Sequence, residues 1–293
     1  MKLINQSAEL LIQPQGLEGM YKQIENAARV CYKSEDKSTG DSKSFVDKLI
    51  KMKHFSMLEH GTIYLHLKKS NMEFPNRVYN LAIKYRKNPY SRTKIDLNSD
   101  NAYITTNYRV IKEHGWEDDL QYLCEPTDNH VKRYTFRLTT SIGIVRELLR
   151  HRVFSFANES TRYCNYSKDK FDNELTFILP SLYDGTCKEF RELASLAAMG
   201  CEIKKESEHY ANLAVGLMFA ESIYITLTDK YKVSPQQARE VLPLCTKSEL
   251  IMTGFEDDWN NFLDVRLKGT TGKPHPDMIE LAKLIEDEIK KTK

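Results

Sequence analysis

Two hydrophobic periods occur in this chain, and their order constrains its fold more than any other feature. Apolar residues recur at helical spacing in residues 17–33 and 43–53, and residues 188–231 hold one or two further long helical runs. Residues 62–67 and 132–138 instead alternate between apolar and polar, which is the period of a half-buried strand. Because the helices and strands are not regularly interleaved, the pattern predicts an α+β fold around one central core.

End signals indicate further helices. Ser141 is placed to cap a helix over residues 142–149. Ser234 is placed to cap a short helix over residues 235–242, with Pro235 at its first position. Helices are also predicted at residues 257–266 and from residue 275 to residue 293.

The stretch from about residue 70 to residue 130 is less regular. It predicts a helix or irregular arm, a turn around Asn88 and Pro89, and a strand over residues 102–111. Residues 88–109 are basic and rich in tyrosine, which would also suit a stacking surface for folate or nucleic acid. We favour an exposed insertion into a smaller fold.

Composition narrows the functional classes. The chain has 293 residues and a net charge of only +2, whereas a protein that coats a nucleic-acid backbone is usually more basic. Neither a signal peptide nor a window long enough for a membrane span is visible. The six cysteines include no C-x-x-C pair, which argues against a zinc site and a disulfide framework. We therefore expect a cytoplasmic protein without a metal, a membrane or a nucleic-acid partner.

One stretch, RHRVFSFANESTRY from Arg150 to Tyr163, concentrates anion-binding groups. Its Arg-His-Arg begins at the end of a predicted helix, and the planar fork of arginine suits phosphate oxygens. The serine, asparagine and backbone N–H groups that follow are the usual material of a phosphate-binding loop. A solvated basic helix end would explain the Arg-His-Arg alone, but it would not explain the loop.

Arg-His-Arg, then seven residues, then serine and Thr-Arg-Tyr resembles the signature of the flavin-dependent thymidylate synthases. Three other segments resemble that family in order and spacing: LEHGTIYLHLK, AREVLPL and NNFLDVR. The resemblance covers most of the chain apart from roughly residues 70–130.

The resemblance implies one domain over residues 1–293, with an insertion at about 70–130. It implies an α+β fold of the thymidylate synthase-complementing-protein type, with a central antiparallel sheet and long helices. Enzymes of the family are homotetramers with active sites at subunit interfaces. They convert dUMP to dTMP, with carbon from 5,10-methylenetetrahydrofolate and reducing equivalents from NAD(P)H that pass through FAD.

The resemblance also assigns site residues. Those expected at FAD are His60, Thr62, Arg150, His151, Arg152 and Asn261. Those expected at dUMP are Glu147, Arg150, Asn158, Glu159, Ser160, Thr161, Arg162, Arg239 and Arg266. Arg266 is the expected catalytic residue, because a cation at the N3–O edge of uracil favours the ring deprotonated at N3 and increases electron density at C5.

No enzymic cysteine nucleophile is implied, although Cys164 adjoins the motif. Ser160 is expected to bind phosphate, since no base is placed to activate it as a nucleophile. Two positions depart from the family pattern. Asp257 stands where many members have an arginine, which puts a contact to the FAD adenosine or phosphates in question. His275 lies nine residues after Arg266, where members often have a histidine four residues on.

Two alternatives stay open at this point. A nucleotide- or RNA-binding module could use the arginine loop without redox chemistry. A flavin NAD(P)H oxidase that has lost methyl transfer would keep the cofactor residues but not the synthase activity. The preference between NADPH and NADH is also open.

Overall fold

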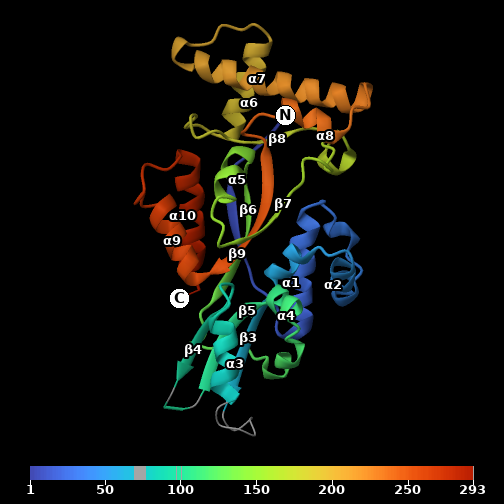
Figure 1. Ribbon diagram of the computed structural model, residues 1–293. Coiled ribbons are helices and arrows are strands. Elements are labelled where there is room, and N and C mark those ends of the chain that lie inside the picture. Colours follow the sequence, from blue (N-terminus) through green and yellow to red (C-terminus); the bar gives the residue numbers. More distant parts are fainter. Residues whose placement is uncertain (69–76, 97, 100, 293) are drawn as a thin grey trace.

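The computed structural model describes residues 1–68, 77–96, 98–99 and 101–292, and the molecule is elongated, with its longest strands along the middle (Figure 1). A four-stranded antiparallel sheet lies at the centre, in the order β2–β6–β9–β7. Its strands are β2 (Ser7–Leu11), β6 (Arg133–Ser141), β7 (Ser155–Asn158) and β9 (Lys247–Phe255). The predicted α+β class with a central antiparallel sheet is confirmed.

Successive residues of β9 face opposite sides of the central sheet, and helices cover both sides. Met252 belongs to a core cluster with α9 (Glu256–Arg266) and α10 (Pro276–Lys290). Ile251 belongs to a cluster with α1 (Gly16–Val30). A strand that is buried on both faces loses its alternating pattern, which is why the sequence did not predict β9.

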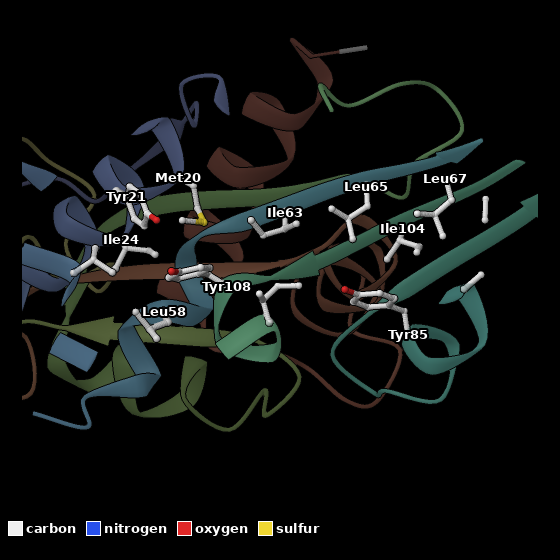
Figure 2. Close-up of a cluster of buried hydrophobic side chains, with 14 of the residues drawn as sticks. Met20, Tyr21, Ile24, Leu58, Ile63, Leu65, Leu67, Tyr85, Ile104 and Tyr108 are labelled. Atoms are coloured by element: carbon white, nitrogen blue, oxygen red, sulfur yellow. The ribbon is translucent and has the colours of Figure 1, made fainter. Parts of the chain in front are cut away.

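A second antiparallel sheet, in the order β3–β5–β4, lies at one end of the molecule (Figure 1). Its strands are β3 (Thr62–Lys68), β4 (Arg92–Asp96) and β5 (Asn101–Asn107). Helices α2 (Ser42–Lys51) and α3 (Arg77–Arg86) contribute to its core. Ile63, Leu65 and Ile104 of this sheet share that core with the side chains of α1 (Figure 2).

The strand predicted over residues 102–111 was wrong beyond Asn107. The side chain of Asn107 accepts a hydrogen bond from the backbone N–H of Val110 at 3.1 Å and caps α4 (Tyr108–His114). The cap turns the chain into a helix where the apolar residues alone suggested more strand.

The other predictions for residues 70–130 have different outcomes. The predicted turn at Asn88 and Pro89 lies between α3 and β4, as expected. Residues 70–76, 97 and 100 of the predicted insertion lie outside the described residues. The insertion itself stays a prediction.

The opposite end of the molecule is helical (Figure 1). There α6 (Cys187–Ala198) and α7 (Glu208–Ile225) pack together, as the long helices predicted for residues 188–231. Contrary to the expectation from the sequence, one helical stretch, Lys205–Lys230, is long and apolar enough to cross a membrane by length and composition alone, a test that core helices also pass. A parallel pair of short strands lies beside these helices: β1 (Lys2–Ile4) and β8 (Thr176–Ile178).

Short helices place the candidate site residues. They are the 3-10 helix η2 (Phe55–His60), α5 (Ile142–Leu148), α8 (Pro235–Ala238) and the 3-10 helix η8 (Arg239–Val241). The predicted cap of α5 is confirmed, because Ser141 Oγ accepts from the backbone N–H of Ile144 at 3.2 Å. Pro235 does open α8, but the preceding Ser234 donates its hydroxyl to Gln237 instead of capping the backbone.

Candidate active site

Arg266 lies at the C-terminal end of α9, beside the end of α5. Its Nε donates to His151 Nε2 at 2.8 Å, and its Nη1 donates to Glu147 Oε2 at 3.0 Å. Its remaining nitrogen, Nη2, has no partner within the described part of the chain. The side chain is 19% exposed. The protein therefore holds one edge of the guanidinium and leaves the other to a ligand.

His151 acts as an acceptor in this cluster, so its Nε2 carries no proton. Burial, and next the positive charge of Arg266, lower the pKa of His151 to about 4. Its ring also lies edge-on against Phe262, with the centroids 5.1 Å apart. At neutral pH the neutral imidazole orients Arg266.

The predicted nucleotide loop follows β7, and its first two residues are tied to the protein. Asn158 Oδ1 accepts from the hydroxyl of Ser248 at 3.1 Å. Glu159 is 1% exposed, and its carboxylate accepts from the hydroxyl of Tyr166 at 2.9 Å and from the ammonium of Lys247 at 2.8 Å. Through these contacts the buried Glu159 side chain anchors the loop to the protein interior.

The rest of the loop carries polar groups nearer the surface. The backbone N–H of Ser160 donates to a carbonyl just after α1. The hydroxyl of Thr161 accepts from Arg239 Nη1 at 3.3 Å, and Arg162 Nε donates to Gln236 at 3.0 Å. Both arginines are exposed. The structure thus brings Arg162 and Arg239, 77 positions apart in the sequence, to the same loop.

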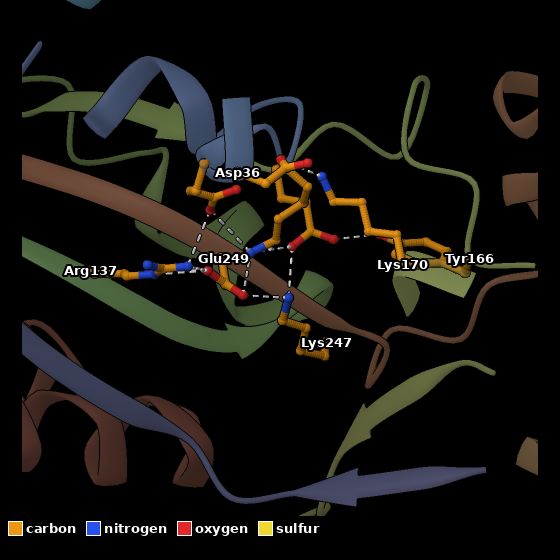
Figure 3. Close-up of polar contacts among 9 residues, drawn as sticks. Asp36, Arg137, Tyr166, Lys170, Lys247 and Glu249 are labelled. Atoms are coloured by element: carbon orange, nitrogen blue, oxygen red, sulfur yellow. Dashed lines mark hydrogen bonds and ion pairs between the residues drawn. The ribbon is translucent and has the colours of Figure 1, made fainter. Parts of the chain in front are cut away.

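Glu159 belongs to a group of paired charges that the sequence analysis missed. We call it the Glu249 network; its members are Lys33, Glu35, Arg137, Glu159, Lys247 and Glu249 (Figure 3). Burial alone would raise the pKa of Glu249, but Lys247 and Lys33 outweigh it and lower that pKa to about 2. The members of the network come from segments far apart in the chain, so no local sequence pattern predicts it.

His60 and Thr62 lie where η2 leads into β3. His60 is fully buried; its Nδ1 lies 2.8 Å from Thr253 Oγ1, while its Nε2 has no partner among the residues described. Burial, and to a smaller extent the charge of Arg133, lower the pKa of His60 to about 3. Thr62 Oγ1 accepts from Arg133 Nη1 at 3.2 Å.

Arg133, the first residue of β6, was not singled out by the sequence. Besides its bond to Thr62, it donates to the backbone carbonyl of Glu59 at 3.1 Å, and its Nε is buried without a partner. In the described ranges no carboxylate forms an ion pair with it. Burial lowers the pKa of Arg133 to about 10. Only its place at the start of a predicted strand was visible in the sequence, and no motif marks it.

The other predicted flavin residues are exposed. Arg150 and Arg152 lie in the turn after α5, and Asn261 lies on α9. Their side chains have no hydrogen-bond partner within the residues described. Arg152 lines the same pocket as Arg133.

Both departures from the family pattern have partners in the structure. Asp257 accepts from Arg92 Nε at 2.9 Å. His275 is the N-cap of α10, where its Nδ1 accepts from the backbone N–H of Asp277 at 3.2 Å. A capping role accounts for His275 without a flavin contact.

The cysteines do not suggest nucleophilic catalysis. Cys164 is 3% exposed, and burial raises the pKa of its thiol to about 11. Burial likewise raises to about 11 the pKa of three other thiols, those of Cys31, Cys124 and Cys245. Within the described residues no group of His, Cys, Asp and Glu side chains could hold a metal ion.

Apart from Arg150, Arg152 and Asn261, whose side chains have no hydrogen-bond partner within the described residues, the predicted site residues form three groups within one chain. Arg266 joins Glu147 and His151, the nucleotide loop joins Arg239, and His60 lies close to Thr62. In the part of the chain that the structure describes, no hydrogen bond or ion pair links one group to another.

A family model described as thymidylate synthase complementing protein matches residues 15–75 and 129–292. The flavin-dependent thymidylate synthase of Tropheryma whipplei (strain TW08/27) is 32% identical over 142 residues, which cover 45% of this chain and 51% of that protein. The enzyme of the same description from Mycobacterium sp. (strain KMS) is 30% identical over 128 residues, covering 43% and 46%. The chain thus spans about half the length of the curated relatives that it matches.

Solved structures are more distant. The UMP/dUMP methylase PolB from Streptomyces cacaoi, bound with 5-Br UMP, is 17% identical with a TM-score of 0.45, covering 99% of this chain and 92% of that one. Thymidylate Synthase X from Helicobacter pylori, with FAD and dUMP, is 15% identical with a TM-score of 0.39, covering 96% and 92%. Both TM-scores are too low for either likeness to support a statement about this chain.

Proposed function

Because the chain belongs to the thymidylate synthase complementing protein family, we propose that it is a flavin-dependent thymidylate synthase that converts dUMP to dTMP. The one-carbon unit comes from 5,10-methylenetetrahydrofolate, and bound FAD transfers reducing equivalents from NAD(P)H. In the net reaction the uracil C5 loses a proton and gains the carbon, the two bonds from that carbon to the folate nitrogens break, and tetrahydrofolate leaves with protons on those nitrogens. The two electrons lost by NAD(P)H, delivered with a proton, reduce the transferred carbon to a methyl group.

The observation that carries this proposal is the junction of two sequence motifs at Arg266. The Arg-His-Arg motif supplies His151, and the Asn-Phe-Leu motif leads to Arg266, which bonds His151 at 2.8 Å. Arg266 then keeps Nη2 for the uracil edge, where its charge would stabilise the ring deprotonated at N3. Glu147 and neutral His151 orient the guanidinium, so its position does not have to be acquired during the reaction.

The donor set near β3 fits a flavin dinucleotide. Arg133 has no carboxylate partner among the described residues, and Arg152 presents its guanidinium at the surface of the same pocket. Buried or half-buried cations are normally paired, so this pocket suits a ligand that brings negative charge. We propose that His60, Thr62, Arg150, His151, Arg152 and Asn261 hold FAD, with Arg133 behind them.

The loop after β7 fits the phosphate of dUMP. Arg162 and Arg239 supply charge, Ser160 and Thr161 supply hydroxyls, and Thr161 also supplies a backbone N–H. Glu159 supports phosphate binding indirectly, because its ion pairs in the Glu249 network anchor the loop to the protein interior. Asn158 contributes in the same way through Ser248.

No cysteine attacks the pyrimidine in this proposal. Cys164 is buried, and its raised pKa keeps the thiol protonated at neutral pH. The activation that a thiolate would provide is assigned instead to the charge of Arg266.

We further propose that complete sites form between subunits of a homotetramer. Three groups of site residues lie in one chain without a hydrogen bond or ion pair between them, as far as the described residues extend. Mixing two inactive variants, Arg266→Ala and Arg162→Ala, should restore part of the activity, because some sites then receive both wild-type groups. An inactive mixture of correctly assembled tetramers would place both residues in a site from one chain.

The decisive experiment measures dTMP formed from dUMP with FAD, 5,10-methylenetetrahydrofolate and NADPH. The wild type should form dTMP, Arg266→Ala should form none, and Arg86→Ala, an exposed arginine of α3, should match the wild type. NADPH oxidation without dTMP would favour the oxidase, and a protein that binds no flavin would favour a nucleotide-binding module.

A further inference from the structure

A pocket of about 230 Å³ lies between two parts of the chain that differ in their relation to the family. Arg133, Arg152 and Asp258 line it from the segments that the family model matches. Tyr90 and Arg92 line it from residues 76–128, which the family model does not match. The pocket therefore has a wall that belongs to this chain and not to the family pattern.

Three arginines give the pocket its charge. Arg133 has no carboxylate in ion-pair contact among the described residues, and Arg152 has no side-chain partner there. Arg92 differs from both, because its guanidinium forms ion pairs with carboxylates. A desolvated guanidinium without a counter-ion is costly, so the pocket as built is suited to receive an anionic group.

Arg92 is held against the start of α9. Its Nε donates to Asp257 Oδ2 at 2.9 Å, and its Nη2 lies 3.4 Å from Asp258. Its guanidinium also stacks over the ring of Phe255, 4.3 Å from the centroid. These contacts direct the charge of Arg92 at the two aspartates, of which Asp258 lines the pocket.

The balance of charge depends on this one residue. Arg92, Arg133, Arg152 and Asp258 line the pocket, and Asp257 adjoins it as the partner of Arg92, so these five groups carry an excess of one positive charge. Without Arg92 the two remaining arginines would only balance the two aspartates, and the excess would vanish. Asp257 is also the residue that stands where the family pattern has an arginine.

We propose that Arg92, from a segment outside the family match, neutralises Asp257 and Asp258 and thereby keeps this pocket able to bind the phosphates of a dinucleotide. The ligand class is a nucleotide that carries a diphosphate, and the assignment of FAD to it rests on the proposed function. In this proposal Arg92 does not touch the ligand. Its guanidinium is occupied by the two aspartates, while Arg133 and Arg152 bind the phosphates.

The test compares binding of FAD and of ADP by four proteins: the wild type, Arg92→Gln, Asp257→Asn and the double variant. FAD binding is followed by quenching of flavin fluorescence and ADP binding by calorimetry. Arg92→Gln should weaken both ligands about tenfold, because the aspartates are then unmasked. The double variant should return to within about threefold of the wild type, since without Asp257 the excess of one positive charge is restored. Arg86→Ala, in the same segment, should bind like the wild type.

The other results overturn the pocket proposal, the proposed function, or both. Unchanged affinity in Arg92→Gln overturns it while leaving the flavoenzyme intact. A double variant as weak as Arg92→Gln would mean that Arg92 touches the phosphates itself. If the wild type binds ADP with this dependence but no FAD, the proposed function fails and the anion pocket stands; if it binds neither, both fail. Thermal unfolding of each variant checks that the fold is retained. Arg92→Lys, which keeps the charge but loses the fork and the stacking on Phe255, should bind more tightly than Arg92→Gln.

Discussion

The Glu249 network and the arginine pocket both gather charge inside the molecule, but they are balanced differently. In the network three cations, Lys33, Arg137 and Lys247, meet three carboxylates (Figure 3). In the pocket Arg133 and Arg152 have no carboxylate partner within the residues described. A balanced cluster is complete without a ligand, whereas an unbalanced one is completed by what it binds. The network therefore supports the loop at Glu159, and the pocket supports binding.

The largest expected effect is on the network. Glu249→Gln removes a carboxylate that Lys33, Arg137 and Lys247 share, and it leaves those cations partly unpaired. We expect the free energy of unfolding to fall by about 3 kcal/mol, as for a broken buried ion pair. Urea unfolding followed by circular dichroism measures it. A loss no larger than that of an exposed charge would mean that the network does not stabilise the fold.

Acidification separates the Glu249 network from His60, whose pKa the charge of Arg133 helps to lower, because Glu249 and His60 titrate in different pH windows. The pKa of His60 is about 3 in the folded protein and 6.5 in its ordinary state, so the unfolded chain binds more protons between these values. Stability therefore falls as the pH drops from 6.5 towards 3, by up to about 1.4 kcal/mol per pH unit from this residue. Glu249, with its lowered pKa, contributes only below its ordinary value of 4.5.

The measurement is the slope of unfolding free energy against pH between 5 and about 6.5, taken for the wild type, His60→Asn and His209→Asn. His60→Asn should reduce the slope, and the exposed His209 should leave it unchanged. His151 keeps part of the slope in every variant, since its pKa is also lowered. Equal slopes for His60→Asn and the wild type would contradict the assignment to His60.

A smaller effect on stability is expected at Arg133, together with a loss of binding. Arg133→Met removes two hydrogen bonds but also removes a desolvated charge, so the unfolding free energy should change by less than about 1 kcal/mol. Binding of FAD, followed by fluorescence quenching, should weaken at least about tenfold. If Arg133→Met destabilised the protein as much as Glu249→Gln and left FAD binding intact, Arg133 would have a structural role. The proposed difference between the pocket and the Glu249 network would then be wrong.

The smallest effect is expected at an exposed pair. Asp264 accepts from Lys268 at 2.7 Å on the surface of α9. Asp264→Asn should leave thermal unfolding without a measurable change, because solvent screens exposed pairs. This variant is the reference against which the Glu249 result is judged, and a clear loss here would show that charge pairs stabilise this protein regardless of burial.

Much of the candidate site could be predicted from the sequence because its motifs are local. The cap at Ser141 and the helix over residues 257–266 place both ends of the Arg266 cluster. That the two ends meet is a contact between α5 and α9, and no spacing in the sequence contains it. At Asn107 the sequence does contain a local signal, the cap of α4, but the apolar pattern around it was interpreted as a continuing strand.

By itself, the amino-acid sequence determined the family, the α+β class and most of the helices, because motifs, periods and caps act over a few residues. Only the tertiary structure decided which charges are paired. It joined Arg92 to Asp257, left Arg133 without a carboxylate partner among the residues described, and surrounded Glu249 with cations. The physical reason is that burial and charge balance are properties of residues that meet in space, and those residues come from segments far apart in the chain.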